Sequence, residues 1–204
     1  MFFATILTAL VAATATNAVR DSRSRLHRQS KRDVDFVDMV VTHHNIHRAN
    51  HSATPIFYHY DMSNTARKIA QSCNFSHNME MDGGGYGQNI AAGVPWQNIS
   101  AVITDLWYNN EVEYFNGQYG KQTPDTSQFE KFGHFSQMVW NATTHVGCYT
   151  QHCPNGVVNA EGTNDFTVCN YLGAGNVDGE WADNVMEPEG HPTYQWNYGM
   201  NSTN

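Results

Sequence analysis

Apolar residues recur at helical spacing in four stretches of the chain, and three of these stretches follow a residue that can cap a helix. The first pattern begins after Asp33, the second after Asp61 and the third after Asn98, while the fourth is the short segment 134–140. The positions that define the first three faces are Phe36, Val40, His44 and His47; Met62, Ala66, Ile69, Ala70 and Cys73; and Ile99, Val102, Ile103 and Leu106. The pattern therefore predicts four helices.

Three shorter runs are typical of β-strands: Phe57 with Tyr58, residues 145–150, and residues 165–172. Helices that flank a central antiparallel sheet make an α+β fold, a three-layer α-β-α sandwich. The glycine-rich run 83–87 precedes no Lys-Ser/Thr pair, so we expect a flexible loop at the rim of the domain and no nucleotide site.

The first 32 residues have the composition of a targeting leader. Residues 1–18 are apolar and small, too short for a comfortable membrane span, and we expect a signal peptide there. Residues 19–32 hold six basic side chains against Asp21 alone, a composition that cannot bury a core. They predict a disordered basic linker or a pro-segment cut after Lys31-Arg32, which would start the mature chain at Asp33. The domain is expected over 33–185, with a C-terminal tail over 186–204, in a secreted, extracellular protein with no transmembrane segment.

Removing this leader leaves five basic and 18 acidic residues, a net charge of −13. Phosphate backbones and anionic bilayers attract proteins through Lys and Arg, so nucleic acid is excluded as a partner.

Four cysteines in an exported chain predict two disulfides, which can pair in three ways. Cys148 and Cys169 both lie in predicted strands, so a cross-strand bridge between them is geometrically plausible. Five glycosylation sequons are also present, and the sequence does not say which are used. They begin at Asn50, Asn74, Asn98, Asn141 and Asn201.

Several motifs occur in a fixed order along the chain. The most informative is Gly-His-Phe-Ser-Gln-Met-Val-Trp at 133–140, where a titratable imidazole sits in a mostly apolar run. The others are His44-Asn45-x-x-Arg48, Trp107-Tyr108 with Tyr114, Val168-Cys169-Asn170-Tyr171, and Gly175-Asn176. Together these segments resemble the CAP superfamily of cysteine-rich secretory, antigen 5 and pathogenesis-related 1 proteins, over about residues 36–185. The segment 83–90 looks most like a fungal branch similar to yeast secreted sterol-binding proteins.

The resemblance implies the same α-β-α fold and a Cys148–Cys169 bridge, which leaves Cys73 to pair with Cys153. It also implies a cleft lined by two His and two Glu. Carried over motif by motif, these four positions fall on His77, Gln88, Asn110 and His134, so each carboxylate is replaced by an amide. Glu111 stands one residue beyond Asn110, and on a regular helix this rotates it by about 100° from the cleft.

An amide cannot act as a general base and is a poor zinc ligand. We therefore expect no required cofactor, at most a weakly bound divalent metal such as zinc on His77 and His134, and no enzymatic activity. Ser136 beside His134 suggests a nucleophile, but neighbouring positions on a helix do not face each other and no orienting acid is evident.

The resemblance implies binding and export of small hydrophobic lipids, sterols or fatty acids. A flexible apolar rim over 86–96 is the candidate contact, although ordinary core packing explains most aromatic residues equally well. Its proposed contacts are Tyr86, Ile90, Val94, Pro95 and Trp96. The alternatives are a secreted effector or allergen that binds a host surface protein and, less favoured, a metal-dependent protease-like hydrolase.

Overall fold

The computed structural model describes residues 4–197, and it divides into two compact units, Met1–Val37 and Asp38–Asn204. Helix α1 (Ala4–Asn50) contributes residues 4–37 to the first unit and residues 38–50 to the second. Among the described residues, no helix combines the length and the apolar character that crossing a membrane requires.

The first unit is helical, and the prediction of an unstructured leader is wrong for its described residues. The physical reason is that no Gly or Pro occurs before Pro55, so no residue breaks the helix. Asp21 and Arg25 also form an ion pair of 2.7 Å at i,i+4 spacing, although both are exposed and the pair contributes only a few tenths of a kcal/mol. None of the described side chains of this unit is buried, as its composition indicates.

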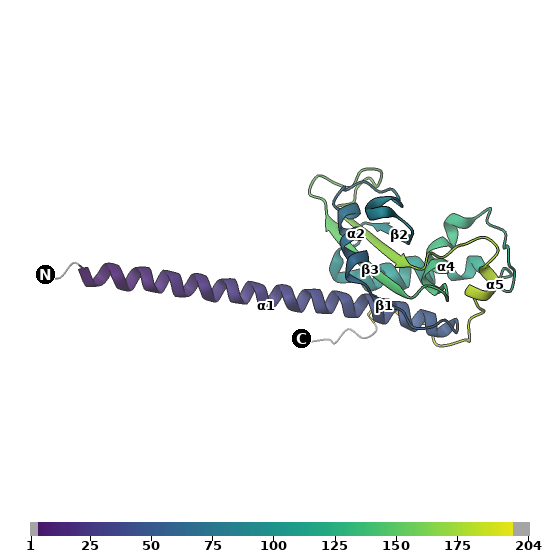
Figure 1. The fold of residues 1–204 in the computed structure, drawn as a ribbon, viewed down its shortest axis with the longest axis horizontal. Coiled ribbons are helices and arrows are strands. Elements are labelled where there is room, and N and C mark those ends of the chain that lie inside the picture. Colours follow the sequence, from purple (N-terminus) through teal and green to yellow (C-terminus); the bar gives the residue numbers. More distant parts are fainter. Residues whose placement is uncertain (1–3, 198–204) are drawn as a thin grey trace. The chain divides into compact units, whose positions relative to one another are not determined.

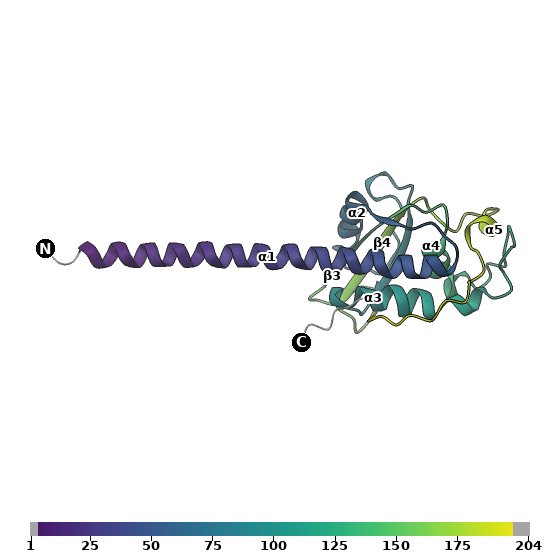
Figure 2. The ribbon, with the colours of Figure 1, turned by 90° about the horizontal axis from the view of Figure 1, so that it is seen from below.

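The second unit is built on a four-stranded sheet with the strand order β1-β3-β4-β2. Its strands are β1 (Phe57–Tyr58), β2 (Gly87–Ala92), β3 (His145–His152) and β4 (Asp165–Leu172). Strands β3, β4 and β2 pair antiparallel, whereas the short β1 pairs parallel to β3. The α+β class is confirmed; the strand that the sequence pattern did not predict is β2. The order of the elements can be followed in Figure 1, and from below in Figure 2.

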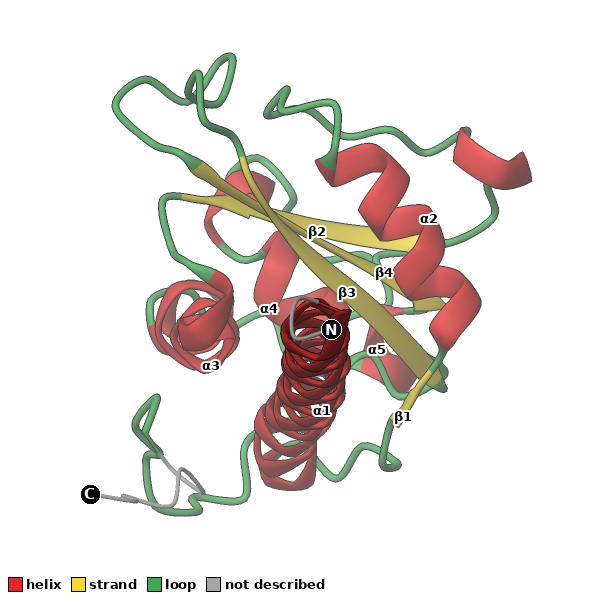
Figure 3. Ribbon diagram, turned by 90° about the vertical axis from the view of Figure 1, so that its left-hand side faces the viewer, coloured by secondary structure: helices red, strands yellow, loops and turns green. Residues whose placement is uncertain are grey.

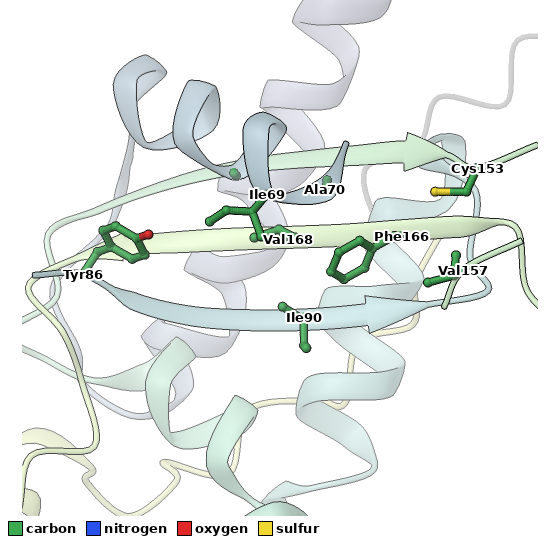
Figure 4. Close-up of a cluster of buried hydrophobic side chains, with 9 residues drawn as sticks. Ile69, Ala70, Tyr86, Ile90, Cys153, Val157, Phe166 and Val168 are labelled. Carbon is green, nitrogen blue, oxygen red and sulfur yellow. The ribbon is translucent and has the colours of Figure 1, made fainter. Parts of the chain in front are cut away.

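One face of the sheet packs on helix α2 (Tyr60–Ala70), whose cap residue His59 accepts a hydrogen bond from the amide of Met62. Figure 4 shows Ile69 and Ala70 of α2 over the strands. The cluster of buried side chains that they form consists of Ala66, Ile69, Ala70, Tyr86, Ile90, Cys153, Val157, Phe166 and Val168. Gly147 of β3 permits this close approach, because a Cβ there would lie 2.2 Å from a backbone nitrogen of α2.

The opposite face is covered by residues 38–50 of α1, by α3 (Ile99–Ala101) with η3 (Val102–Asn109), and by α4 (Gly133–Val139). Figure 3 shows the strands between α2 and these helices, which makes the three layers of the expected sandwich. The remaining short helices are η1 (Met81–Gly83), η2 (Trp96–Asn98), η4 (Val112–Phe115), η5 (Phe129–Lys131) and α5 (Trp181–Asn184).

Two disulfides close the domain. Cys148 and Cys169 face each other across β3 and β4 and are bonded, and Cys73 is bonded to Cys153. These are the pairings that the family resemblance implies.

The segment after α5 lies along the end of α1 and η3. The amide of Glu189 donates to the carbonyl of Asn50 at 2.7 Å, and the side chain of Asn109 donates to the carbonyl of Tyr194 at 3.3 Å. The described part of the expected tail is therefore hydrogen-bonded to the domain.

Candidate functional site

His134, at the start of α4, is held by the carboxylate of Glu111 and by the indole of Trp107. Its Nδ1 lies 2.6 Å from a carboxylate oxygen of Glu111, and the other oxygen of Glu111 accepts the backbone amide of Phe135 at 2.9 Å. The imidazole also stacks on the indole of Trp107, with ring centroids 5.7 Å apart and planes 16° apart. With Nδ1 occupied by the carboxylate, Nε2 is the nitrogen left for a ligand, and 30% of the His134 side chain is exposed.

Glu111, and not Asn110, supplies the carboxylate beside His134, so the prediction that Glu111 points away is wrong. The reason is that η3 is a π-helix: the amide of Asn110 bonds to the carbonyl of Asp105, five residues back. The wider turn holds one extra residue, which brings Glu111 to the angular position that Asn110 would take on a regular α-helix. The side chain of Asn110 is exposed, whereas Glu111 is buried.

The sequence carries no periodic signal for this shift. Counting three residues on from Trp107, as on a uniform helix, leads to Asn110. The one indication of another partner is that Glu111, the residue after Asn110, is a carboxylate.

His77 has a different partner, the amide of Gln88 on β2. The Oε1 atom of Gln88 lies 3.0 Å from Nδ1 of His77 and also accepts the amide of Asn78. Because a carbonyl oxygen only accepts, the proton of a neutral His77 sits on Nδ1, which leaves a lone pair on Nε2. The Nε2 group of Gln88 donates to the carbonyl of Asn78 and to the side chain of Asn170. Gln88 therefore orients His77 as Glu111 orients His134, but without a negative charge.

The two imidazoles thus belong to two separately oriented pairs. An acceptor on Nδ1 that fixes the tautomer is typical of histidines that ligate metals through Nε2. Within residues 4–197, however, no group of three or more His, Cys, Asp and Glu side chains is arranged to hold a metal ion. His77 also borders an open pocket of about 390 Å³ beside α2, together with Lys68, Asn74 and Met81.

Ser136 is buried and turned away from this chemistry. Its hydroxyl lies 2.7 Å from the side-chain oxygen of Asn176 and 3.0 Å from the carbonyl of Phe132 in the preceding turn. Its hydrogen bonds thus go to structural partners and none goes to His134.

Much of the expected lipid-binding rim is core. Residues 87–92 form strand β2 and pair with β4 along their whole length, so the prediction of a flexible loop is wrong there. Ile90 is buried, and so is Tyr86, whose hydroxyl donates to the carbonyls of Asn78 and Met81. Burial raises the pKa of this hydroxyl, with a smaller contribution from the nearby Asp82. Beyond the strand, Val94 and Trp96 are half-buried and Pro95 is exposed.

A buried network of hydrogen bonds connects the backbone of His134 to helix α1. Asn89 donates to the backbone carbonyl of His134 and to the hydroxyl of Tyr171. Tyr171 in turn lies 2.9 Å from Nε2 of His44, whose Nδ1 donates to the carbonyl of Val40. His44 is therefore held as a neutral imidazole that accepts from Tyr171.

Burial lowers the pKa of His44 to about 3 and that of His47 also to about 3. An unfolded histidine titrates near 6.5, so between pH 6.5 and about 3 the unfolded chain binds more protons than the fold. The stability that the neutral form contributes is complete above about pH 6.5 and is lost as the pH falls below it, by about 1.4 kcal/mol per pH unit for each histidine.

Comparison with known proteins agrees with this architecture. The model of the cysteine-rich secretory protein family matches residues 41–171. A probable pathogenesis-related protein of Arthroderma benhamiae is 46% identical over 159 residues, which cover 78% of this chain and 51% of that protein. Protein PRY2 of Saccharomyces cerevisiae is 36% identical over 153 residues, 74% of this chain and 41% of that protein. The chain thus spans about half the length of these relatives or less.

Among solved structures, a crystal structure of NaASP2 with Zn²⁺ is similar, with a TM-score of 0.56 and 24% identity over 76% of this chain and 84% of that one. This likeness concerns the fold alone. The extent of the family match, the two disulfides and the α-β-α layers lead to one conclusion. The chain belongs to the cysteine-rich secretory protein, or CAP, family.

Proposed function

We propose that this protein is secreted and that it binds and exports small hydrophobic lipids, sterols or fatty acids. The observation that carries the proposal is the segment Val94-Pro95-Trp96, which follows β2 and leaves apolar surface in reach of solvent. Apolar side chains at the rim of a domain, outside its packed core, can cover a hydrophobic ligand without unfolding the core. The family resemblance supports the same ligand class.

The region that we propose to bind lipid is smaller than the one that the sequence suggested. Tyr86 and Ile90 are packed against α2 and β4, and removing them from that core would cost about 2 to 5 kcal/mol each. The contact is therefore assigned to residues 94–96 alone.

Hydrolysis is the weaker alternative. Glu111 gives His134 the orienting acid that a catalytic base needs, which favours an enzyme more than the sequence did. Yet Ser136, the nearest hydroxyl in the sequence, is bonded elsewhere, and His77 faces an amide in place of a second carboxylate. A binding protein requires neither feature.

We propose that zinc binds weakly, with the Nε2 atoms of His77 and His134 as its protein ligands. Zinc sites that bind tightly use three or four protein ligands, and two imidazoles with water completing the shell give only modest affinity. Glu111 and Gln88 would hold the two rings in the tautomer that binds.

Secretion is proposed from residues 1–18 as a signal peptide and 19–32 as a pro-segment. N-terminal sequencing of the secreted protein tests this directly, and we expect Asp33 as the first residue. A start at Val19 would contradict the pro-segment but not secretion.

The lipid proposal is tested with purified secreted protein and radiolabelled sterol or palmitate. We expect saturable binding that falls at least about tenfold in Val94→Asp, because a carboxylate there opposes contact with an apolar ligand. Val158→Asp is the matched control, since Val158 is a 60% exposed valine elsewhere on the domain, and His134→Ala should bind lipid normally. Absence of saturable binding to either ligand, or equal loss in both valine variants, would refute the proposal.

A further inference from the structure

The five sequons are equivalent in the sequence, but the fold treats them differently. Asn98, at the end of η2, is exposed, and its side chain makes no hydrogen bond within residues 4–197. Asn50, Asn74 and Asn141 are all half-buried, and Asn201 lies outside the described residues.

Both ends of the Asn50 amide are in use. Its Nδ2 donates to the hydroxyl of Tyr108 at 2.9 Å, and its Oδ1 accepts the backbone amide of His191 at 2.9 Å. The same Tyr108 hydroxyl contacts Nε2 of the buried His51 at 2.9 Å. A sugar on Nδ2 would have to fit between the end of α1, Tyr108 and the segment around His191, so this position is closed in the folded protein.

The side-chain amides of Asn74 and Asn141 also make hydrogen bonds. Asn74 donates to Ser76 and accepts from Asn159, and the Oδ1 atom of Asn141 accepts the amide of Thr54. Of the described sequons, Asn98 is therefore the one with an exposed and unbonded amide.

Ser100, the third residue of the Asn98 sequon, is a second and independent indication that this sequon is used. Its side chain is fully buried, and its hydroxyl has no hydrogen-bond partner among the described residues. A buried hydroxyl without a partner costs about 1 to 3 kcal/mol, so the packing of α3 gives no reason for serine in place of alanine. The glycosylation machinery does give a reason, since it requires Ser or Thr at this position.

We propose that Asn98 is an N-glycosylation site of this protein and that Asn50 stays unmodified. The donor is a lipid-linked oligosaccharide diphosphate. A bond forms between Nδ2 of Asn98 and the anomeric carbon, the bond from that carbon to the diphosphate breaks, the lipid diphosphate leaves, and the amide loses one proton. The inference rests on the secretion part of the proposed function, because the transfer occurs on the export route. The glycan stands two residues after Trp96, beside the proposed lipid contact.

The test is glycopeptide mapping of the full chain secreted from a eukaryotic host, after an endoglycosidase has trimmed each glycan to one N-acetylglucosamine. We expect the sugar on the Asn98 peptide and none on the Asn50 peptide. Asn98→Gln and Ser100→Ala should each remove one glycan, whereas Asn50→Gln should leave the glycan content unchanged.

A second measurement separates the modification from folding. In deglycosylated protein, Ser100→Ala should melt at the same temperature as the wild type or higher, because it removes an unpartnered hydroxyl. Secreted protein with an unmodified Asn98, or with a sugar on Asn50, overturns the assignment while leaving secretion intact. A chain that remains in the cytosol overturns secretion and the glycosylation site together.

Discussion

Replacing Arg48 tests how the end of α1 is joined to α4 and the loop that follows it. The guanidinium is fully buried and faces backbone carbonyls, and it uses every N–H group that it has. It donates to the carbonyls of Thr54 (2.8 Å), Met138 (2.8 Å), Trp140 (2.9 Å), Asn141 (3.4 Å) and Thr143 (2.8 Å). Burial lowers the pKa of Arg48 to about 10, so the side chain is still charged at pH 7.

The magnitude follows from the carbonyls that Arg48→Met would leave behind. Trp140 retains a bond from the amide of Thr143, and Asn141 retains one from the hydroxyl of Thr54. The bonds to Met138 and Thr143 are buried, and each of these carbonyls left without its charged donor costs about 1 to 3 kcal/mol. Thr54 is exposed, so its carbonyl can turn to water. The desolvation cost of the guanidinium is recovered in the variant and offsets part of this. We expect a net loss of about 3 to 5 kcal/mol.

The assay is urea unfolding at pH 7 with both disulfides intact. With a slope of about 2 kcal/mol per M, the midpoint of Arg48→Met should fall by about 2 M. Arg48→Lys keeps the charge but has only three donors on one nitrogen, and we expect about half this loss. Arg67→Met on the exposed side of α2 is the control and should change stability by less than about 0.5 kcal/mol. A loss below about 1 kcal/mol in Arg48→Met would refute the reasoning.

Three further predictions concern pH, zinc and sheet packing. The fold holds His44 and His47 neutral, so the free energy of unfolding should fall by about 3 kcal/mol per pH unit below pH 6.5 and stay level above it. Urea unfolding at several pH values measures this, and a stability that does not change below pH 6.5 would contradict it. In calorimetric titrations, Glu111→Gln should weaken zinc binding about 10- to 100-fold through the orientation of its histidine, while Asn110→Glu, an exposed change one residue away, should leave it unaltered. Gly147→Ala should destabilise the domain by more than about 2 kcal/mol, because the added Cβ would clash with the backbone of α2. Thermal unfolding measures this, and a variant that melts at the wild-type temperature would show that α2 can move aside.

The helices could be predicted because their apolar positions recur at helical spacing. Strands β3 and β4, like β2, show no regular alternation of buried and exposed positions, but they are rich in Val, Thr, Tyr and Phe, the residue types favoured in strands. Strand β2 could not be predicted, since residues 87–92 contain Ile90 as their one β-branched residue and the preceding glycines suggest a loop.

In the candidate site, the two histidines could be predicted from the sequence, but the partner of His134 could not. His134 and His77 stand in recognisable motifs, and each has a partner on its Nδ1 atom. The partner of His134 could not be assigned correctly, because a π-helix changes which residue faces the site and leaves no periodic trace in so short a segment. Counting along a uniform helix selects Asn110, and the i→i+5 bond at that residue selects Glu111.

The most direct test of the proposed function is photo-crosslinking of the secreted protein with a diazirine-bearing sterol, followed by peptide mapping. The account predicts a saturable crosslink on the peptide that contains Val94, Pro95 and Trp96, competed by unlabelled sterol and lost in Val94→Asp. A saturable crosslink on the peptides that contain His77 or His134 would place the ligand in the histidine site, and the absence of any competable crosslink would contradict lipid binding.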